Sequence, residues 1–171
     1  MFNLGVQLTY NLDMKKSFID AYAKLLTHYC GDINPGDKVL IRSTYLAEPL
    51  ILACQREVLL AGGVCEFDIT LPGVKKQRLD FSTDKQLAHP PILYAHAMNE
   101  FNVIVSINAP YDLFELDGID EKKLALVQSS IRPIKKIMMN RGATRDLRWV
   151  LCNYPTQSLA DAANMSLQEY T

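Results

Sequence analysis

Residues 102–107 read NVIVSI, a short stretch that is apolar at nearly every position. Three other short, mostly apolar stretches occur at residues 38–42 (KVLIR), 64–69 and 148–153. Segments with helical spacing separate them. Strands that are apolar throughout and alternate with helices are typical of a parallel sheet with helices on both faces. The sequence therefore predicts an α/β fold with three layers (αβα) around a mainly parallel sheet of about four strands.

Two helices are predicted in the first part of the chain. Residues 14–30 follow a candidate N-cap, Asp13, and end before Gly31. Their apolar stripe consists of Phe18, Tyr22, Leu25, Leu26 and Tyr29. Residues 46–61 return to the helical period and end at Gly62-Gly63. One face of this second helix holds Leu50, Cys54, Val58 and Ala61.

The second half of the chain predicts a polar connection over residues 70–83 and a helix over residues 84–101, interrupted near Pro90-Pro91. Residues 120–140 predict a long helix, which Pro133 should kink because proline lacks one backbone donor and crowds the preceding turn. A short helix is expected from residue 155 to about residue 163. This order predicts a Rossmann- or flavodoxin-like domain over residues 14–164, and the pattern leaves the structure of residues 1–13 open.

The composition indicates a single ordinary domain and excludes several function classes. The chain has 171 residues, 49% of them hydrophobic, with 18 basic and 19 acidic side chains and a net charge of −1. No basic stripe favours nucleic acid as a partner, and no apolar run reaches the length of a membrane span. The start of the chain lacks the pattern of a signal peptide. Four cysteines without a C-x-x-C pair are typical of buried free thiols in the reduced cytoplasm.

The candidate site is a polar rim at the carboxyl ends of the predicted strands, where open α/β sheets bind their ligands. The strand ends contribute Ser43-Thr44-Tyr45, Asp68-Ile69-Thr70, Asn108-Ala109-Pro110 and Asn153-Tyr154-Pro155. These are hydroxyls and amides with one carboxylate, and they form neither an acid–base pair nor a nucleophile with its base. Asn, Thr, Pro and Tyr also end strands without any function. Both interpretations remain open on the sequence alone.

Several motifs for cofactors and catalysis are absent from the sequence. The first strand is followed by STYLAEP, which offers no glycine-rich cradle for a nucleotide phosphate. The histidines, His28, His89 and His96, form no H-E-x-x-H motif and have no carboxylate at an obvious ligand spacing. No G-x-S-x-G nucleophile elbow occurs either. We therefore expect no catalytic and no metal-binding residue in this chain.

The last seven residues carry the signature of a helix start. Ser166 and Glu169 have the spacing of a capping box, and Met165 and Tyr170 that of a hydrophobic staple. Only two residues follow Glu169, which is far too few for a helix that is stable by itself. The motif either occurs by chance or begins a helix that leads onward.

An ordered set of segments resembles the amino-terminal domain of the aminopeptidase T / aminopeptidase S family, the thermophilic metalloproteases. The segments are AYAKLLTHYC, INPGDKVLIRS, AEPLILACQREVLLAGG, ELDGIDEKKLALVQSSIRPI and RWVLCNYPTQSLADAANMSLQEYT. The resemblance covers residues from about 14 to 171. The last segment, with its Arg148-Trp149 pair and its MSLQEY box, carries the resemblance most strongly.

The resemblance implies a two-domain, metal-dependent exopeptidase that is a cytoplasmic homodimer and removes amino-terminal residues from peptides. Two divalent ions, zinc or cobalt, would be held by Glu, His, Tyr and Asp ligands in a carboxy-terminal domain. Residues 165–171 would then begin a helix leading to that missing catalytic domain, and this chain alone would be inactive. The predicted role of this domain is to wall the active-site cavity through Thr44, Asp68, Asn108, Asn153 and Tyr154.

The sequence is also compatible with two other interpretations. The chain could be a stand-alone α/β module for binding or oligomerisation without catalysis, because fold alone does not determine function. A nucleotide-binding protein is disfavoured by the missing glycine loop.

Overall fold

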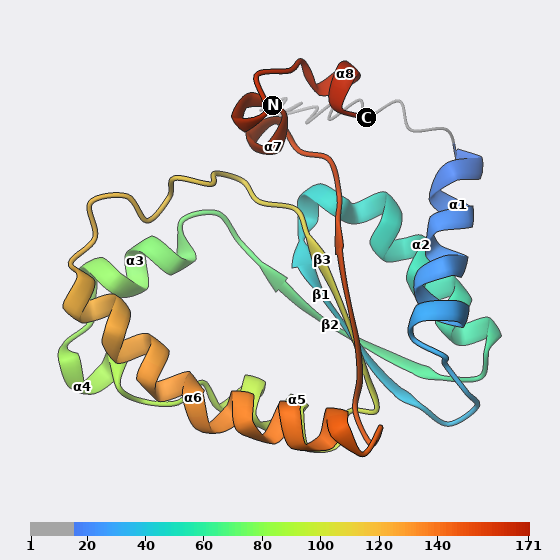
Figure 1. Cartoon of the computed structure of the whole chain (residues 1–171), viewed down its shortest axis with the longest axis horizontal. Coiled ribbons are helices and arrows are strands. Elements are labelled where there is room, and N and C mark those ends of the chain that lie inside the picture. Colours follow the sequence, from blue (N-terminus) through green and yellow to red (C-terminus); the bar gives the residue numbers. More distant parts are fainter. Residues whose placement is uncertain (1–15) are drawn as a thin grey trace, which may run out of the picture.

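In a computed structural model, which describes residues 16–171, the strands form one sheet in which every neighbouring pair is parallel (Figure 1). The strands are β1 (Lys38–Thr44), β2 (Val64–Thr70), β3 (Val103–Asn108) and β4 (Arg148–Asn153). Their order across the sheet is β2-β1-β3-β4. Helices lie on both faces, so the predicted three-layer α/β fold with a parallel four-stranded sheet is confirmed.

One face of the sheet is covered by α1 (Lys16–Lys24), the π-helix η1 (Leu25–Cys30) and α2 (Glu48–Leu60), which follows the short 3₁₀ turn η2 (Tyr45–Ala47). The larger core lies here. The predicted inner face of α2 is confirmed, because Leu50, Cys54 and Val58 are fully buried. They pack with alternate residues of the strands, such as Val39 and Val105.

The predicted apolar stripe of the first helix is only partly correct. Leu26 is buried, but Phe18 and Tyr29 are 55% and 82% exposed. The buried positions are instead Ile19, Ala23, Leu26 and Thr27. Ile19, Ala23 and Leu26 also have helical spacing, and their stripe lies beside the one formed by the large side chains. The π-helical turn of η1, whose hydrogen bonds span one more residue than those of an α-helix, shifts the face further.

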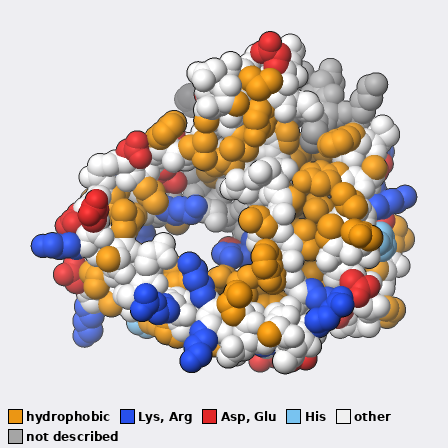
Figure 2. All heavy atoms as spheres, viewed as in Figure 1, with side chains coloured by type: hydrophobic (Ala, Val, Ile, Leu, Met, Phe, Trp, Pro, Cys, Tyr) orange, Lys and Arg blue, Asp and Glu red, His pale blue; other side chains and the backbone are white. Residues whose placement is uncertain are grey.

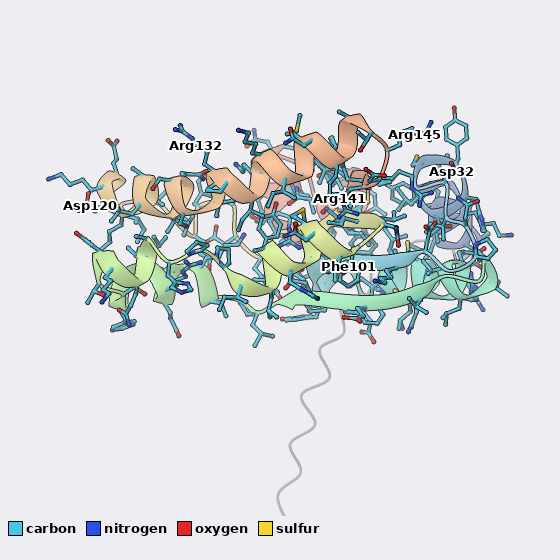
Figure 3. The ribbon with its side chains drawn as sticks, turned by 90° about the horizontal axis from the view of Figure 1, so that it is seen from below. Asp32, Phe101, Asp120, Arg132, Arg141 and Arg145 are labelled. Carbon is cyan, nitrogen blue, oxygen red and sulfur yellow. The ribbon has the colours of Figure 1, made fainter. Side chains whose placement is uncertain are left out.

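The opposite face is covered by α5 (Ile92–Glu100) and α6 (Glu121–Ala143), which run along each other in Figure 3. A smaller core lies between them and the sheet. It contains Leu40, Met98, Phe101, Ile104, Ile134 and Leu147. Pro133 lies inside α6 as expected. The predicted interruption at Pro90-Pro91 is confirmed, since α4 (Asp84–Leu87) ends before it and α5 begins after it.

The prediction of a polar connection over residues 70–83 is wrong for most of that segment. It contains the helix α3 (Val74–Phe81), in which only Leu79 is buried. A helix with a single buried residue has no apolar stripe, and so its periodicity leaves no signal in the sequence.

We call α3, α4 and the amino-terminal half of α6 the outer arm. Leu79 and Leu87 are buried within it, and the Lys123 ammonium donates to the Leu79 carbonyl. The outer arm extends beyond the part of the sheet that α5 covers (Figure 1). Figure 2 shows that an opening remains between the outer arm and the sheet, with Lys and Arg side chains on its border.

The chain ends in α7 (Gln157–Ala162) and α8 (Leu167–Tyr170). The short helix predicted near residue 155 is thus present as α7. The capping box at the start of α8 is also present: the Ser166 hydroxyl accepts from the Glu169 N–H, and the Glu169 carboxylate accepts from the Ser166 N–H at 2.9 Å. None of the helices in residues 16–171 is long and apolar enough to cross a membrane.

The cysteines are only partly as predicted. All are free thiols, but Cys54 and Cys152 are buried while Cys65 is half-buried and Cys30 is exposed. Cys30 lies on the outer side of η1, again because the π-turn changes which side chains face the sheet.

Candidate functional site

On the two central strands, β1 and β3, the sheet face that carries α5 and α6 is divided into an apolar half and a polar half. At the amino-terminal ends of the strands, Leu40 pairs in register with Ile104, and both are buried beneath the two helices. Side chains two residues further along a strand point to the same face. The next residues on this face are Arg42 on β1 and Ser106 on β3, which also pair in register. This second pair is polar, whereas the first is apolar.

The polar half consists of two rows that cross the sheet. In the first row Asp68, Arg42 and Ser106 are neighbours on β2, β1 and β3, and Leu151 ends the row on β4. The second row lies at the carboxyl ends of the strands. It contains Thr70, Thr44, Asn108 and Asn153. A buried sheet face is normally apolar, so this change of character indicates a surface for water or a ligand.

Arg42 is the central charged group of the polar half. Its Nε donates to Asp68 Oδ2 at 2.8 Å, and its guanidinium lies 4.6 Å from the ring centroid of Tyr94 on α5. A cation above an aromatic face is attracted by the ring electrons. These two contacts fix the guanidinium at the boundary between the covered and the uncovered half of the sheet face.

An amide pair and a hydroxyl organise the second row. Asn108 Nδ2 donates to Asn153 Oδ1 at 2.9 Å, and both side chains are exposed. The Thr44 hydroxyl donates to the Ala109 carbonyl at 2.6 Å and accepts from the Leu46 N–H. The Tyr111 hydroxyl donates to the Thr70 carbonyl at 3.0 Å, and its ring lies 5.1 Å from that of Tyr45. The loop after β3 is therefore tied to the ends of β1 and β2.

The structure brings together four of the five residues predicted from the sequence. Thr44, Asp68, Asn108 and Asn153 lie on the polar half. Tyr154 differs, because it is fully buried in the larger core beneath the opposite face. Its hydroxyl has no hydrogen-bond partner among the described residues, and burial raises its pKa. Tyr154 therefore supports the rim from inside the core.

Sequence reasoning missed Arg42, Ser106 and Tyr94. The signal for Arg42 was present in KVLIRST, where a charged residue interrupts an apolar strand that two other strands flank. Tyr94 carried no comparable signal, since its role depends on the position of α5 over the sheet.

The polar half presents hydroxyls, amides and one ion pair. Residues 16–171 contain no group of three or more His, Cys, Asp or Glu side chains that could hold a metal ion. Asp68 accepts from Arg42 and forms an ion pair with it. This arrangement is suited to positioning a ligand by hydrogen bonds.

A family model described as thermophilic metalloprotease (M29) matches residues 15–171. Among solved structures, wild-type AmpT from Thermus thermophilus is similar in fold, with a TM-score of 0.70 and 17% sequence identity. The similarity covers 86% of this chain and 38% of the AmpT chain, so this chain spans well under half of that protein's length. A comparison with curated proteins finds no match.

Proposed function

Since the chain belongs to the thermophilic metalloprotease family, we propose that it forms the amino-terminal domain of a metal-dependent aminopeptidase, which removes amino-terminal residues from peptides. The family match over residues 15–171 supports a peptidase, and the 38% share of the AmpT chain supports a further part that follows this domain. The α8 capping box is a suitable start for a helix that enters that part.

The metal chemistry belongs, on this proposal, to a carboxy-terminal catalytic domain. The residues described in the structure offer no ligand cluster, so they do not fit two divalent ions, and no step of the reaction is assigned to them. Zinc or cobalt would be bound elsewhere in the parent protein, which we propose to be a cytoplasmic homodimer. This chain alone would then have no peptidase activity.

The role proposed for this domain is to wall the active-site cavity. The observation that carries the proposal is the polar half of the sheet face, with Thr44, Asp68, Asn108 and Asn153 on one surface and Tyr154 supporting it from the core. Amide and hydroxyl groups match the donors and acceptors of a peptide backbone. A wall of this chemistry would hold short peptides and limit their length.

The test uses the protein at its native length, supplied with zinc or cobalt. Release of the amino-terminal residue from short peptides, abolished by a chelator, is the expected result. Asn108→Ala and Asn153→Ala should alter the KM or the preferred peptide length. Asn140→Ala, on the exposed end of α6, is the matched control and should alter neither. Unchanged kinetics in both rim variants would contradict the role of a cavity wall.

A stand-alone binding or oligomerisation module is the second candidate, and one surface favours it. An apolar groove of about 350 Å³ lies between α2 and the edge strand β2. It is lined by Tyr45, Glu48, Ile51, Leu52, Gln55, Phe67 and Ile69. A native protein of this length that hydrolyses no peptide and self-associates would support this second function instead.

A further inference from the structure

We propose that Arg42 is the binding residue for the carboxy-terminal carboxylate of a peptide that occupies the opening beside the polar half of the sheet. The choice of a peptide as the ligand rests on the proposed function. The choice of a carboxylate rests on the surroundings of Arg42 itself.

Arg42 occupies an unusual position for a charged residue. It lies on β1, which has a neighbouring strand on each side, and it directly follows Leu40 on a face whose preceding row is buried. A guanidinium in the middle of a sheet has to be desolvated in part, and its side chain is only 33% exposed. The ion pair with Asp68 and the ring of Tyr94 compensate for that desolvation.

The two contacts leave the end of the guanidinium available. Asp68 accepts from Nε alone, and the Nη groups donate to no other described residue. Guanidinium nitrogens form a planar fork that matches the two oxygens of a carboxylate. Because the side chain is already held at Nε and by stacking on Tyr94, little of its freedom remains to be lost when a carboxylate binds.

The neighbouring row supplies partners for a peptide backbone. Within the amide pair, Asn108 Nδ2 donates to Asn153 Oδ1. Asn108 Oδ1 and Asn153 Nδ2 form no hydrogen bond with the described residues, which leaves a carbonyl oxygen as an acceptor and an amide nitrogen with its two N–H groups as a donor. Rows two residues apart on a strand are separated by about 6.6 Å, and adjacent strands by about 4.8 Å. A peptide whose carboxylate binds Arg42 can therefore reach the amides with its next peptide groups.

The charge of Asp68 limits the strength of this site. Its carboxylate, 48% exposed, lies against Arg42 and would repel a second carboxylate. The site should consequently distinguish a carboxylate from a neutral amide by about tenfold rather than by several orders of magnitude.

The experiment measures binding by isothermal titration, with the protein at its native length. The probes are acetyl-Ala-Ala, its carboxy-terminal amide, and acetyl-Ala-Glu-amide, whose carboxylate is on the side chain. Acetylated peptides have no free amino terminus, so their binding is measured apart from any aminopeptidase reaction. Loss of peptide hydrolysis in a separate assay would therefore count against the proposed function and leave this measurement valid.

We expect the wild-type protein to bind acetyl-Ala-Ala about tenfold more tightly than its amide. Arg42→Gln should abolish this preference, and Arg42→Lys should keep only part of it because an ammonium lacks the planar fork. Arg132→Gln is the matched control. Arg132 lies on α6, on the side turned away from α5 (Figure 3), and its substitution should leave the preference unchanged.

Three results would overturn the proposal: equal binding of acid and amide by the wild type, no binding of either, or an unchanged preference in Arg42→Gln. Tighter binding of acetyl-Ala-Glu-amide than of acetyl-Ala-Ala would overturn the assignment to a carboxy-terminal carboxylate. If Arg42→Gln does not fold, Asp68→Asn decides. That variant keeps Arg42, keeps a side-chain oxygen that can accept from its Nε, and removes the repelling charge. It should therefore bind acetyl-Ala-Ala more tightly, and weaker binding would contradict the proposal.

Discussion

Replacing Tyr154 by phenylalanine should stabilise the protein. The Tyr154 side chain is completely buried, and its hydroxyl has no hydrogen-bond partner among the described residues. Leaving such a group buried costs about 1–3 kcal/mol, while the ring itself packs in the larger core. Tyr154→Phe keeps the ring and removes the unpaired group, so we expect a gain of about 1–2 kcal/mol in the free energy of unfolding.

The gain is large enough to measure by thermal unfolding. An unfolding entropy of about 2.1 cal/mol/K per residue, over 171 residues, gives about 0.36 kcal/mol/K. A gain of about 1–2 kcal/mol then raises the Tm by about 3–6 °C. Urea unfolding followed by tryptophan fluorescence provides an independent value, since the chain has a single tryptophan, Trp149 on β4.

The matched variant is Tyr154→Ala, which also removes the ring. It should cost about 3–5 kcal/mol, as is usual when a large buried aromatic residue is truncated. A loss of stability in Tyr154→Phe would refute the reasoning, because it would mean that the hydroxyl has a stabilising partner. Equal losses in the two variants would show that the hydroxyl and not the ring accounts for the contribution of Tyr154.

Three further predictions concern other parts of the fold. Arg148→Met should destabilise the protein by about 3–5 kcal/mol in urea unfolding, because it breaks a mostly buried ion pair with Asp37 at 2.7 Å; a change below about 0.5 kcal/mol would contradict this. Burial raises the pKa of Glu57, but hydrogen bonds from His28 and Arg56 outweigh it and lower the pKa below 4.5. A carboxyl group whose pKa is lowered in the folded state contributes stability that is present above pH 4.5 and is lost as the pH falls below it. Glu57→Gln should therefore make the free energy of unfolding less dependent on pH in the acid range. An equally steep dependence in the variant would count against this. Iodoacetamide at pH 8, with labelling followed by mass spectrometry, should react with the exposed Cys30 first. Burial raises the pKa of the Cys54 thiol to about 12 and protects it, so early labelling of Cys54 would disprove this.

The sheet was predictable from the sequence, whereas its strand order was not. The central strands β1 and β3 are short, mostly apolar stretches, whereas β2 and β4 have several exposed positions. The observed bounds of the four strands differ from the predicted ones by at most two residues at either end. Apolar character shows only that a strand is buried on both faces. Which strand lies beside which depends on crossovers and on packing with helices, and these leave no local pattern. The order β2-β1-β3-β4 therefore came from the structure.

The candidate site was predictable where it depends on topology and not where it depends on packing. The carboxyl ends of parallel strands meet at one edge, which placed Asn108 next to Asn153. Successive side chains along a strand point to opposite faces of the sheet, and this rule places Tyr154 and Asn153 on different faces. The significance of Arg42 depends on where the covering helices end, a property of α5 and α6 that no strand residue reveals.

The division of one sheet face into an apolar and a polar half has a consequence for how such a protein can evolve. Folding depends on Leu40, Ile104 and the helices above them, while the polar rows lie outside both cores. Exposed substitutions away from core contacts usually change stability by less than about 0.5 kcal/mol. Descendants of this chain could therefore replace the exposed members of these rows, such as Asn108 and Asn153, and acquire a different ligand preference while the scaffold remains folded.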